Sequence, residues 1–373
     1  MSLSPDSPAL DAWLTLQQLP QPGGRARIEL LAQLGGIEAV FAASRAELER
    51  ALPENPQTVE AIVRGPDAAG AERLRQWLAQ ETNRHLVVWD DPDYPPLLRE
   101  IADPPLALHV IGDRALLATA QLALVGSRNP TPAGIENARA FARSLACAGL
   151  AITSGLALGI DGAAHRGALE AGGKTLAVCG TGLDRVYPAR HRELAHAIAA
   201  QGALISEFPL GTPPQAWHFP VRNRLISGLS LGVLVIEAAL QSGSLITARL
   251  ANEQGREVFA LPGSIHSPLA RGCHALIRQG AKLVETAQDV IEELGALAQF
   301  VRVPAPPSIE KLHADVPPDA AQLLACLGHD PATLDALVER SGLTADAVSS
   351  MLVTLELDGL VATMPGGRYQ RLP

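Results

Sequence analysis

The sequence lacks the features of a metal site, a disulfide-stapled fold and a membrane span. Its cysteines lie far apart among apolar residues, at Cys147, Cys179, Cys273 and Cys326. That spacing fits neither a disulfide framework nor a set of metal ligands, so we expect reduced thiols in the core. No segment approaches the ~18 consecutive apolar residues of a membrane helix, and the first residues do not resemble a signal peptide. We therefore expect a soluble cytoplasmic protein without a metal.

Basic side chains are also scarce. The 30 Lys and Arg residues are outnumbered by 39 Asp and Glu residues, the formal net charge is -9, and lysine occurs only at positions 174, 282 and 311. A basic field over the whole protein, which would attract a polyanion from a distance, is therefore excluded. Any polyanion has to be bound by a local group of arginines.

The chain has enough length and apolar content for two or three domains, with 373 residues of which 47% are hydrophobic. Residues 1–82 show short amphipathic stretches between Gly and Pro, which predicts a small helical domain of the SAM or helix-hairpin kind. Residues 83–298 alternate strands with helices. Residues 299–318 are rich in Pro and Ala and predict a linker, and residues 319–373 show three helical patterns and a hairpin, which is typical of a winged-helix-like domain.

The middle region contains seven short apolar segments separated by helical patterns. They are Leu122–Val125, Ala151–Thr153, Thr175–Cys179, Ala203–Ser206, Val233–Ile236, Val258–Leu261 and Lys282–Val284. Two further short strands, at 86–89 and 107–111, flank a proline-rich turn and lead into the sheet. Apolar strands that alternate with helices predict an α/β fold with an extended Rossmann-like, doubly wound parallel sheet. Ligands of such a sheet bind beyond the carboxyl ends of its strands.

The first of these strand ends carries Gly126, Ser127 and Arg128, which we call the GSR turn. Such a turn directs backbone N–H groups and a helix N-terminus outward, and an arginine adds a planar cation beside them. The turn is therefore a candidate binding site for a phosphate. A tight strand-to-helix turn with a solvated Arg128 is the alternative.

The following strand ends add further small residues. Ser154 and Gly155 follow the second strand, and Ser242, Gly243 and Ser244 open a helix that is a second candidate anion site. The sequence has no G-x-G-x-x-G after the first strand, so we expect no nicotinamide cofactor.

Asp161 and His165 follow the second strand with i,i+4 spacing. They are compatible with a catalytic pair. The alternative is structural: Asp161 as the N-cap of a helix, with His165 as its partner on the same helix face.

The most informative loop has the sequence WHFPVRNRLISGLS. Phe219 precedes a helical run in which Arg222 and Arg224 flank Asn223. Arginines bind phosphate with two parallel hydrogen bonds, and an aromatic face stacks on bases of any identity. This combination indicates a nucleic-acid site. In the alternative, Trp217 and Phe219 belong to the core, and Arg222 or Arg224 pairs with Glu207 or Glu237.

Taken together, these loops strongly resemble the DprA/Smf family of DNA-processing proteins. The resemblance covers about residues 86 to 295 and rests on ordered blocks: VGSR, SGLALGIDGAAHRGAL, GTGLDRVYP, SEFPLG, FPVRNRLISGLS, EAALQSGSLITARLANEQGREVFALPG and RGCHALIRQGAKLV. It implies a protein that binds single-stranded DNA, forms a homodimer and loads the RecA recombinase during natural transformation. We expect no enzymatic turnover, because the dinucleotide fingerprint is absent and Thr247 stands where a related hydrolase loop carries a glutamate.

On matching positions, the resemblance makes Arg128 a phosphate contact and places Phe219 and the segment Arg222-Asn223-Arg224 at the DNA pocket. Members can also carry a lysine a few residues before that phenylalanine, where this chain has Gln215-Ala216. His218 and Arg190 are the candidates to make the phosphate contact in place of that lysine.

Two other functions compete with this interpretation. Nucleotide phosphoribohydrolases of the lysine-decarboxylase-like type resemble one another in a PGGxGTxxE loop, and Thr247 stands here in place of that Glu. A winged-helix regulator would read duplex DNA, but the candidate recognition helix at 344–358 contains Asp346, Glu356 and Asp358 and neither Lys nor Arg. Protein contact is therefore the better expectation for that helix.

The segment 258–269 carries apolar side chains around Pro262-Gly263, late in the sheet, where an edge needs cover. Because the resemblance also implies a homodimer, this segment predicts a homodimer contact near Ile265 and Leu269.

Overall fold

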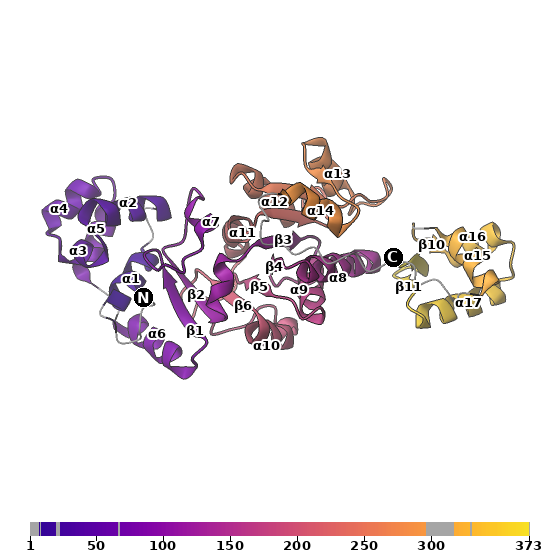
Figure 1. Cartoon of the computed structure of the whole chain (residues 1–373), viewed down its shortest axis with the longest axis horizontal. Coiled ribbons are helices and arrows are strands. Elements are labelled where there is room, and N and C mark those ends of the chain that lie inside the picture. The colour runs from indigo at the N-terminus through magenta and orange to yellow at the C-terminus, as the bar shows by residue number, and fades with distance from the viewer. Residues whose placement is uncertain are drawn as a thin grey trace.

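The computed structural model describes residues 7, 9–19, 23–65, 68–295, 317–328 and 330–372. The predicted linker at 299–318 lies outside the described residues except for its last two positions. The domain boundaries inferred from the sequence stay predictions. Figure 1 shows helices at the N-terminal end, a central sheet flanked by helices, and a small helical unit with short strands at the C-terminal end.

Short helices fill the N-terminal region. They are α1 (Ala9–Gln18), α2 (Gly24–Leu34), α3 (Ile37–Ala42), α4 (Arg45–Ala51), α5 (Pro56–Arg64) and α6 (Ala68–Gln80). Gly35 ends α2 in the left-handed conformation, and Ser44 and Glu47 form a reciprocal capping box at the start of α4. The apolar faces of these helices share one core with Leu86 and Leu204 of the sheet, so the region packs directly against the sheet.

Within the described residues, nine strands form the central sheet. They are β1 (Arg84–Val88), β2 (Ala107–Gly112), β3 (Gln121–Val125), β4 (Ala151–Ser154), β5 (Thr175–Val178), β6 (Ala203–Ser206), β7 (Gly232–Val235), β8 (Glu257–Ala260) and β9 (Lys282–Leu283). Their order is β1-β2-β6-β5-β4-β3-β7-β8-β9. The strands from β3 onward pair with one another in parallel, which confirms the predicted doubly wound α/β sheet.

The two lead-in strands depart from the parallel pattern. β2 pairs antiparallel with both β1 and β6. A parallel pairing of β1 with β2 needs a long crossover, which is usually a helix that packs on one face of the sheet. Between these strands lie only a proline-rich turn and the short helix α7 (Pro96–Arg99). The sheet is therefore mixed, with an antiparallel extension on its N-terminal side.

Side-chain alternation along β3 explains why helices cover both faces. Leu122 and Leu124 pack in one core with α8 (Pro132–Cys147), α9 (Ile160–Glu170) and α14 (Ala287–Leu294). Ala123 and Val125 pack in the opposite core with α11 (His218–Gly228), α12 (Gly243–Glu253) and α13 (Arg271–Arg278). Successive side chains of a strand point to opposite faces, so a strand that is apolar at every position needs cover on both. The helix α10 (Arg192–Gln201) packs beside β6 toward the N-terminal helices.

The C-terminal described residues have a core of their own. Residues 317–328 and 330–372 form α15 (Pro318–Leu327), β10 (Ala332–Thr333), α16 (Leu334–Ser341), α17 (Ala345–Leu357), β11 (Val361–Met364) and β12 (Arg368–Arg371). This confirms the predicted winged-helix pattern and adds the short strand β10, which pairs with β12. The helix α17 contains neither Lys nor Arg.

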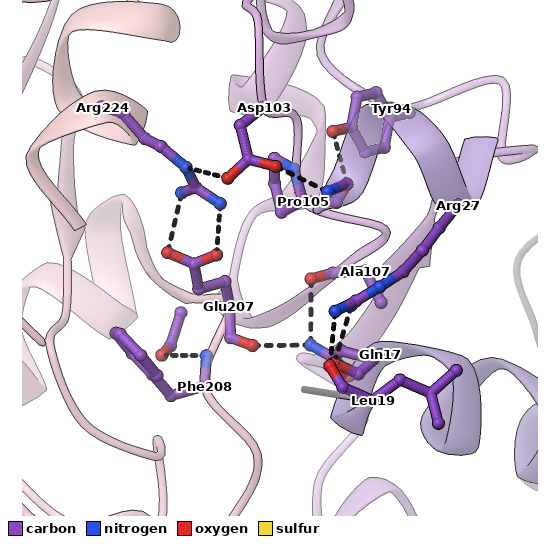
Figure 2. Close-up of polar contacts among 12 residues, drawn as sticks. Gln17, Leu19, Arg27, Tyr94, Asp103, Pro105, Ala107, Glu207, Phe208 and Arg224 are labelled. Atoms are coloured by element: carbon purple, nitrogen blue, oxygen red, sulfur yellow. Dashed lines mark hydrogen bonds and ion pairs between the residues drawn. The ribbon is translucent and has the colours of Figure 1, made fainter. Parts of the chain in front are cut away.

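A group of polar contacts joins the N-terminal helices to the sheet (Figure 2). Arg224 of α11 donates two parallel hydrogen bonds to the Glu207 carboxylate, at 2.8 and 2.6 Å, and its Nε lies 3.2 Å from Asp103. The same Asp103 carboxylate accepts from the backbone N–H of Gly24 at the start of α2. Gln17 of α1 donates to the carbonyl of Glu207 at 2.6 Å. Arg224 thus joins the segments of Asp103 and Glu207, and these two residues in turn bond to α2 and α1.

This geometry predicts that Arg224→Ala lowers the free energy of unfolding by roughly 3 kcal/mol, because the mostly buried Glu207 carboxylate then loses its cationic partner. The side chains of Arg224 and Glu207 are both only 14% exposed. Unfolding in urea, followed by tryptophan fluorescence, measures the loss.

The matched control is Arg249→Ala, because Arg249 also forms an ion pair, with Glu253, but on an exposed helix face. This variant removes the same charge and should cost less than about 1 kcal/mol. Equal losses in the two variants would contradict the structural role of Arg224.

Candidate nucleic-acid interface

A cleft of about 730 Å³ opens at the carboxyl ends of β3 and β7. The chain leaves β3 toward β4 on one side, while β7 pairs with β3 on the other side, so this is the point where the strand order reverses. Ligands of doubly wound sheets bind at this point. The GSR turn, the first turns of α11 and the N-terminus of α12 line the opening, which we call the strand-end cleft.

The GSR turn is held in place from behind. The first turn of α9 packs against it, where the N–H of Ile160 donates to the Ser127 carbonyl at 3.1 Å. Arg128 is exposed, and its guanidinium carbon lies 5.4 Å from the centre of the Phe219 ring. Among the described residues, Arg128 has no carboxylate within ion-pair distance. Its charge is therefore available to an anion in the cleft.

Phe219 lies at the start of α11, with one face on the backbone of Gly180. A Cβ atom at position 180 would lie 3.0 Å from the ring, so glycine is needed for this close approach. The Tyr187 ring lies beside it, with the ring centres 5.6 Å apart. Tyr187 is 47% exposed and also lines the cleft. The opening therefore presents two neighbouring aromatic rings and an exposed guanidinium.

Arg222 forms the floor below Phe219. It is only 3% exposed, and its Nη1 donates to the carbonyls of Gly155, at 2.7 Å, and Val178. These carbonyls follow or end β4 and β5, so the guanidinium ties both strand ends to α11. Burial lowers the pKa of Arg222, while the nearby Asp161 carboxylate acts in the opposite direction. Arg222 thus positions Phe219 from beneath, with its guanidinium carbon 5.9 Å from the ring centre.

The N-terminus of α12 faces the cleft from the β7 side. Ser242 is its N-cap and accepts a hydrogen bond from the N–H of Ser244 at 3.3 Å, and their hydroxyl oxygens lie 2.7 Å apart. Asn223 of α11 donates to the Gly243 carbonyl at 3.4 Å, which joins the two helices across the cleft. A helix N-terminus at this place, together with Arg128, favours a bound anion.

The structure brings most of the predicted site residues together and leaves three apart. Lining the cleft are Gly126, Ser127, Arg128, Phe219, Arg222, Asn223, Ser242, Gly243 and Ser244. Ser154 is fully buried and donates to the Leu124 carbonyl, and Gly155 lies behind the lining, between Arg222 and Asp161. Arg224 points away from the cleft to Glu207 and Asp103 (Figure 2).

Of the structural alternatives for these residues, one is confirmed and one is wrong. The predicted pairing of an arginine with Glu207 is confirmed for Arg224. The assignment of Trp217 and Phe219 to the core is wrong, because Trp217 is 60% exposed and Phe219 is partly exposed at the cleft. His218 is buried with its Nδ1 3.1 Å from the Gly180 carbonyl, so it does not take the place of the missing lysine.

Asp161 and His165 do not form the helix pair that their spacing predicts. The N-cap of α9 is Gly159, and the Asp161 carboxylate accepts from the N–H groups of Gly155 and Ala157, at 3.1 and 3.3 Å. Burial raises the pKa of Asp161, against the effect of Arg222.

His165 lies deeper in the fold. Its Nδ1 is 2.7 Å from the Thr175 hydroxyl, and burial lowers its pKa to about 3. Both residues therefore have structural roles: Asp161 bonds to the loop after β4, and His165 bonds to Thr175 of β5.

Glu237, after β7, is also structural. Its carboxylate accepts from the backbone N–H of Thr131, at 2.9 Å, and from the Thr131 hydroxyl, at 2.6 Å, at the start of α8. Burial raises its pKa. Within the described residues, no three His, Cys, Asp or Glu side chains gather to hold a metal ion, and no helix is long and apolar enough to cross a membrane.

Tyr187 follows the third strand of the sequence pattern and also lines the cleft, although it was not among the expected DNA contacts. Its signal lay in the segment RVYPARHR, where an aromatic residue stands between arginines. Such interleaving is typical of surfaces that bind nucleic acid.

Comparisons with known proteins give matches over most of the chain. The family model described as DNA recombination-mediator protein A matches residues 85–295, and the one described as DprA winged helix domain matches residues 303–367. Protein Smf of Escherichia coli is 48% identical over 298 residues, which cover 79% of this chain and 79% of that protein.

Two solved structures are also similar. The X-ray structure of DNA processing protein A from Streptococcus pneumoniae has a TM-score of 0.67 and 36% identity, and the match covers 79% of this chain and 99% of that one. A structure of DNA processing protein A from Helicobacter pylori, whose title describes a single-stranded DNA binding mode, has a TM-score of 0.51 and 33% identity, covering 56% of this chain and 95% of that one.

Proposed function

Because the chain belongs to the DNA recombination-mediator protein A family, we propose that it binds single-stranded DNA in the strand-end cleft. The observation that carries the proposal is the pairing of Arg128 with Phe219 at the cleft opening. Arg128 is exposed, has no carboxylate within ion-pair distance among the described residues, and lies beside the partly exposed ring of Phe219. A cation for the phosphate and a ring for the base are the two components of single-strand recognition.

The shape of the site supports single strands over a duplex. Phe219 and Tyr187 both line the cleft with neighbouring rings, and a base has to leave its stack to lie against them. Bases of a single strand are accessible in this way. The relative from Helicobacter pylori, described as binding single-stranded DNA, supports the same choice.

The residue roles follow from the geometry. Arg128, the backbone N–H groups of the GSR turn and the α12 N-terminus at Ser242 contact phosphates, and Phe219 stacks on a base. Arg222 and Asn223 position these groups through their bonds to the backbone. Arg224 maintains the fold and takes no part in the DNA contact.

We further propose that the protein protects incoming single-stranded DNA and loads the RecA recombinase onto it during natural transformation. The description of the family as recombination mediators supports this step. The acidic and apolar surface of α17 supports a protein partner for the winged helix, since Val353 and Leu357 are exposed on a helix without basic residues.

We also propose that the protein has no enzymatic turnover. In the competing nucleotide hydrolases a glutamate assists sugar-bond cleavage, whereas Thr247 stands at that place here and is buried on α12. Asp161 is the one carboxylate among the described residues that line the cleft, and two backbone N–H groups occupy it.

We also propose a homodimer. Ile265 is 75% exposed in the loop after β8, and Leu283 is 51% exposed on the edge strand β9. Exposed apolar side chains beside a sheet edge favour association with a second copy. Leu269 contributes less than the sequence indicated, because its side chain is half-buried and lines the strand-end cleft.

The binding proposal predicts different salt dependences for two variants. Arg128→Ala should weaken binding of poly-dT and flatten its log–log salt dependence by ~0.7, because the protein then neutralises one phosphate fewer on the strand. Phe219→Ala should cost ~1–3 kcal/mol and leave the slope nearly unchanged, because stacking releases no counterions. Affinity is measured over a series of salt concentrations, and circular dichroism verifies folding.

Arg143→Ala is the matched control, since it removes an exposed arginine of α8 outside the cleft. Parent-like binding by Arg128→Ala, or a slope change in Phe219→Ala, would show that these roles are wrong.

The absence of turnover predicts that incubation with nucleoside monophosphates releases no free base, as measured by chromatography. The physical reason is that Asp161, the one carboxylate among the described residues that line the cleft, already accepts hydrogen bonds from two backbone N–H groups. Release that survives purification and disappears in Asp161→Asn would favour the hydrolase.

The dimer proposal predicts that Ile265→Glu yields a monomer by light scattering, because a charge then lies in the apolar contact. Val63→Glu, at an exposed apolar position of α5, is the control and should leave the mass unchanged. A dimer that persists in Ile265→Glu places the interface elsewhere.

A further inference from the structure

We propose that a bound strand continues from the strand-end cleft over the segment 185–192 into a second groove, between α6 and α10. This inference rests on the proposed single-strand binding and extends it to a second stretch of the same strand. The N-terminal helical region thereby becomes part of the nucleic-acid interface.

The segment that separates the two openings is rich in exposed arginines. Its sequence is RVYPARHR, and Arg185, Arg190 and Arg192 are all exposed. Arg185 has a carboxylate within ion-pair distance, Asp184 at 3.5 Å, whereas Arg190 and Arg192 have none among the described residues. In a chain of net charge -9, three exposed arginines within eight residues form a strong local concentration of positive charge.

The second groove, which we call the α6–α10 groove, has a volume of about 800 Å³. Its basic lining residues are Arg73 of α6, Arg84 of β1, and Arg185, Arg192 and His196 on the side of α10. Its acidic lining residues are Glu81 and Asp184. Arg84 forms part of the wall, because it bonds Glu81 at 2.7 Å and lies over the Trp77 ring. The lining as a whole carries an excess of positive charge.

Consecutive residues connect the two openings. Tyr187 lines the strand-end cleft, while Arg185 and Val186 line the α6–α10 groove. The ring of Tyr187 lies beside Phe219 and is nearly half exposed, so it offers a base a second face at the crossing point. A strand that leaves Phe219 over Tyr187 therefore comes next to Arg185, two residues away, which lines the groove.

The chemistry of this path fits a single strand better than other occupants. An arginine-lined groove binds the phosphates, and a neighbouring exposed ring accommodates bases of any identity. A duplex keeps its bases stacked and gains only the phosphate contacts. The partner we assign to the groove is therefore single-stranded DNA.

The test compares binding of short and long oligo-dT, of about 4 and about 16 nucleotides, which span the site sizes of compact single-strand binders. The variant is Arg185→Ala with Arg192→Ala, and fluorescence anisotropy gives the affinity. The short strand fills only the strand-end cleft, so the variant should bind it like the parent. For the long strand, removing the two arginines that meet phosphates should flatten the salt slope by about 1.4 and weaken binding about 25-fold at 0.1 M salt.

The control variant, Arg143→Ala with Arg249→Ala, changes the net charge equally at exposed sites on α8 and α12 and should bind both strands like the parent. A duplex of the long length should bind the groove variant almost as well as it binds the parent.

The outcomes separate the two levels of the proposal. If the parent binds the short strand and the groove variant matches the control on the long strand, the second groove is overturned and the cleft stands. If duplex binding falls as much as long-strand binding, the groove is a general phosphate surface, which also overturns the inference. If the parent binds neither strand, the proposed function itself fails.

Discussion

One buried guanidinium organises the proposed binding site. Arg222 donates to backbone carbonyls at the ends of β4 and β5, and by doing so it fixes the start of α11 over the sheet. Phe219, three residues earlier on α11, is thereby held over Gly180 and next to Arg128. A charge this deeply buried is costly unless its hydrogen bonds are satisfied, so the carbonyls and the nearby Asp161 are part of the same unit.

The protein combines an acidic surface with a polyanion site by dividing its arginines between two tasks. Arg224 is neutralised by Glu207 and Asp103, the two residues to which the N-terminal helices bond. Arg128 has no such carboxylate among the described residues and lies at the cleft opening. Because screening limits exposed charges to about 8–10 Å at physiological salt, the distant acidic residues weaken this local site only slightly.

Much of the fold could be predicted from local patterns. The seven predicted strands of the parallel sheet agree with the structure to within one residue at each end, because each is a short apolar run between glycines, loops and helical patterns. The GSR turn and the Ser242 helix start were identified for the same reason. The antiparallel pairing of β2 was not predictable in this way, since pairing direction depends on the path between strands and leaves no mark on their composition.

The sequence by itself determined the order of strands and helices, the edge of the sheet where ligands bind, and the presence of arginines and an aromatic residue there. Only the tertiary structure decided which arginine does what. Arg222 and Arg224 lie two positions apart on one helix, so their side chains point about 200° apart and face different surroundings. Those surroundings are Gly155 and Val178 for one, and Asp103 and Glu207 for the other. They come from distant parts of the chain, and no local pattern around α11 specifies them.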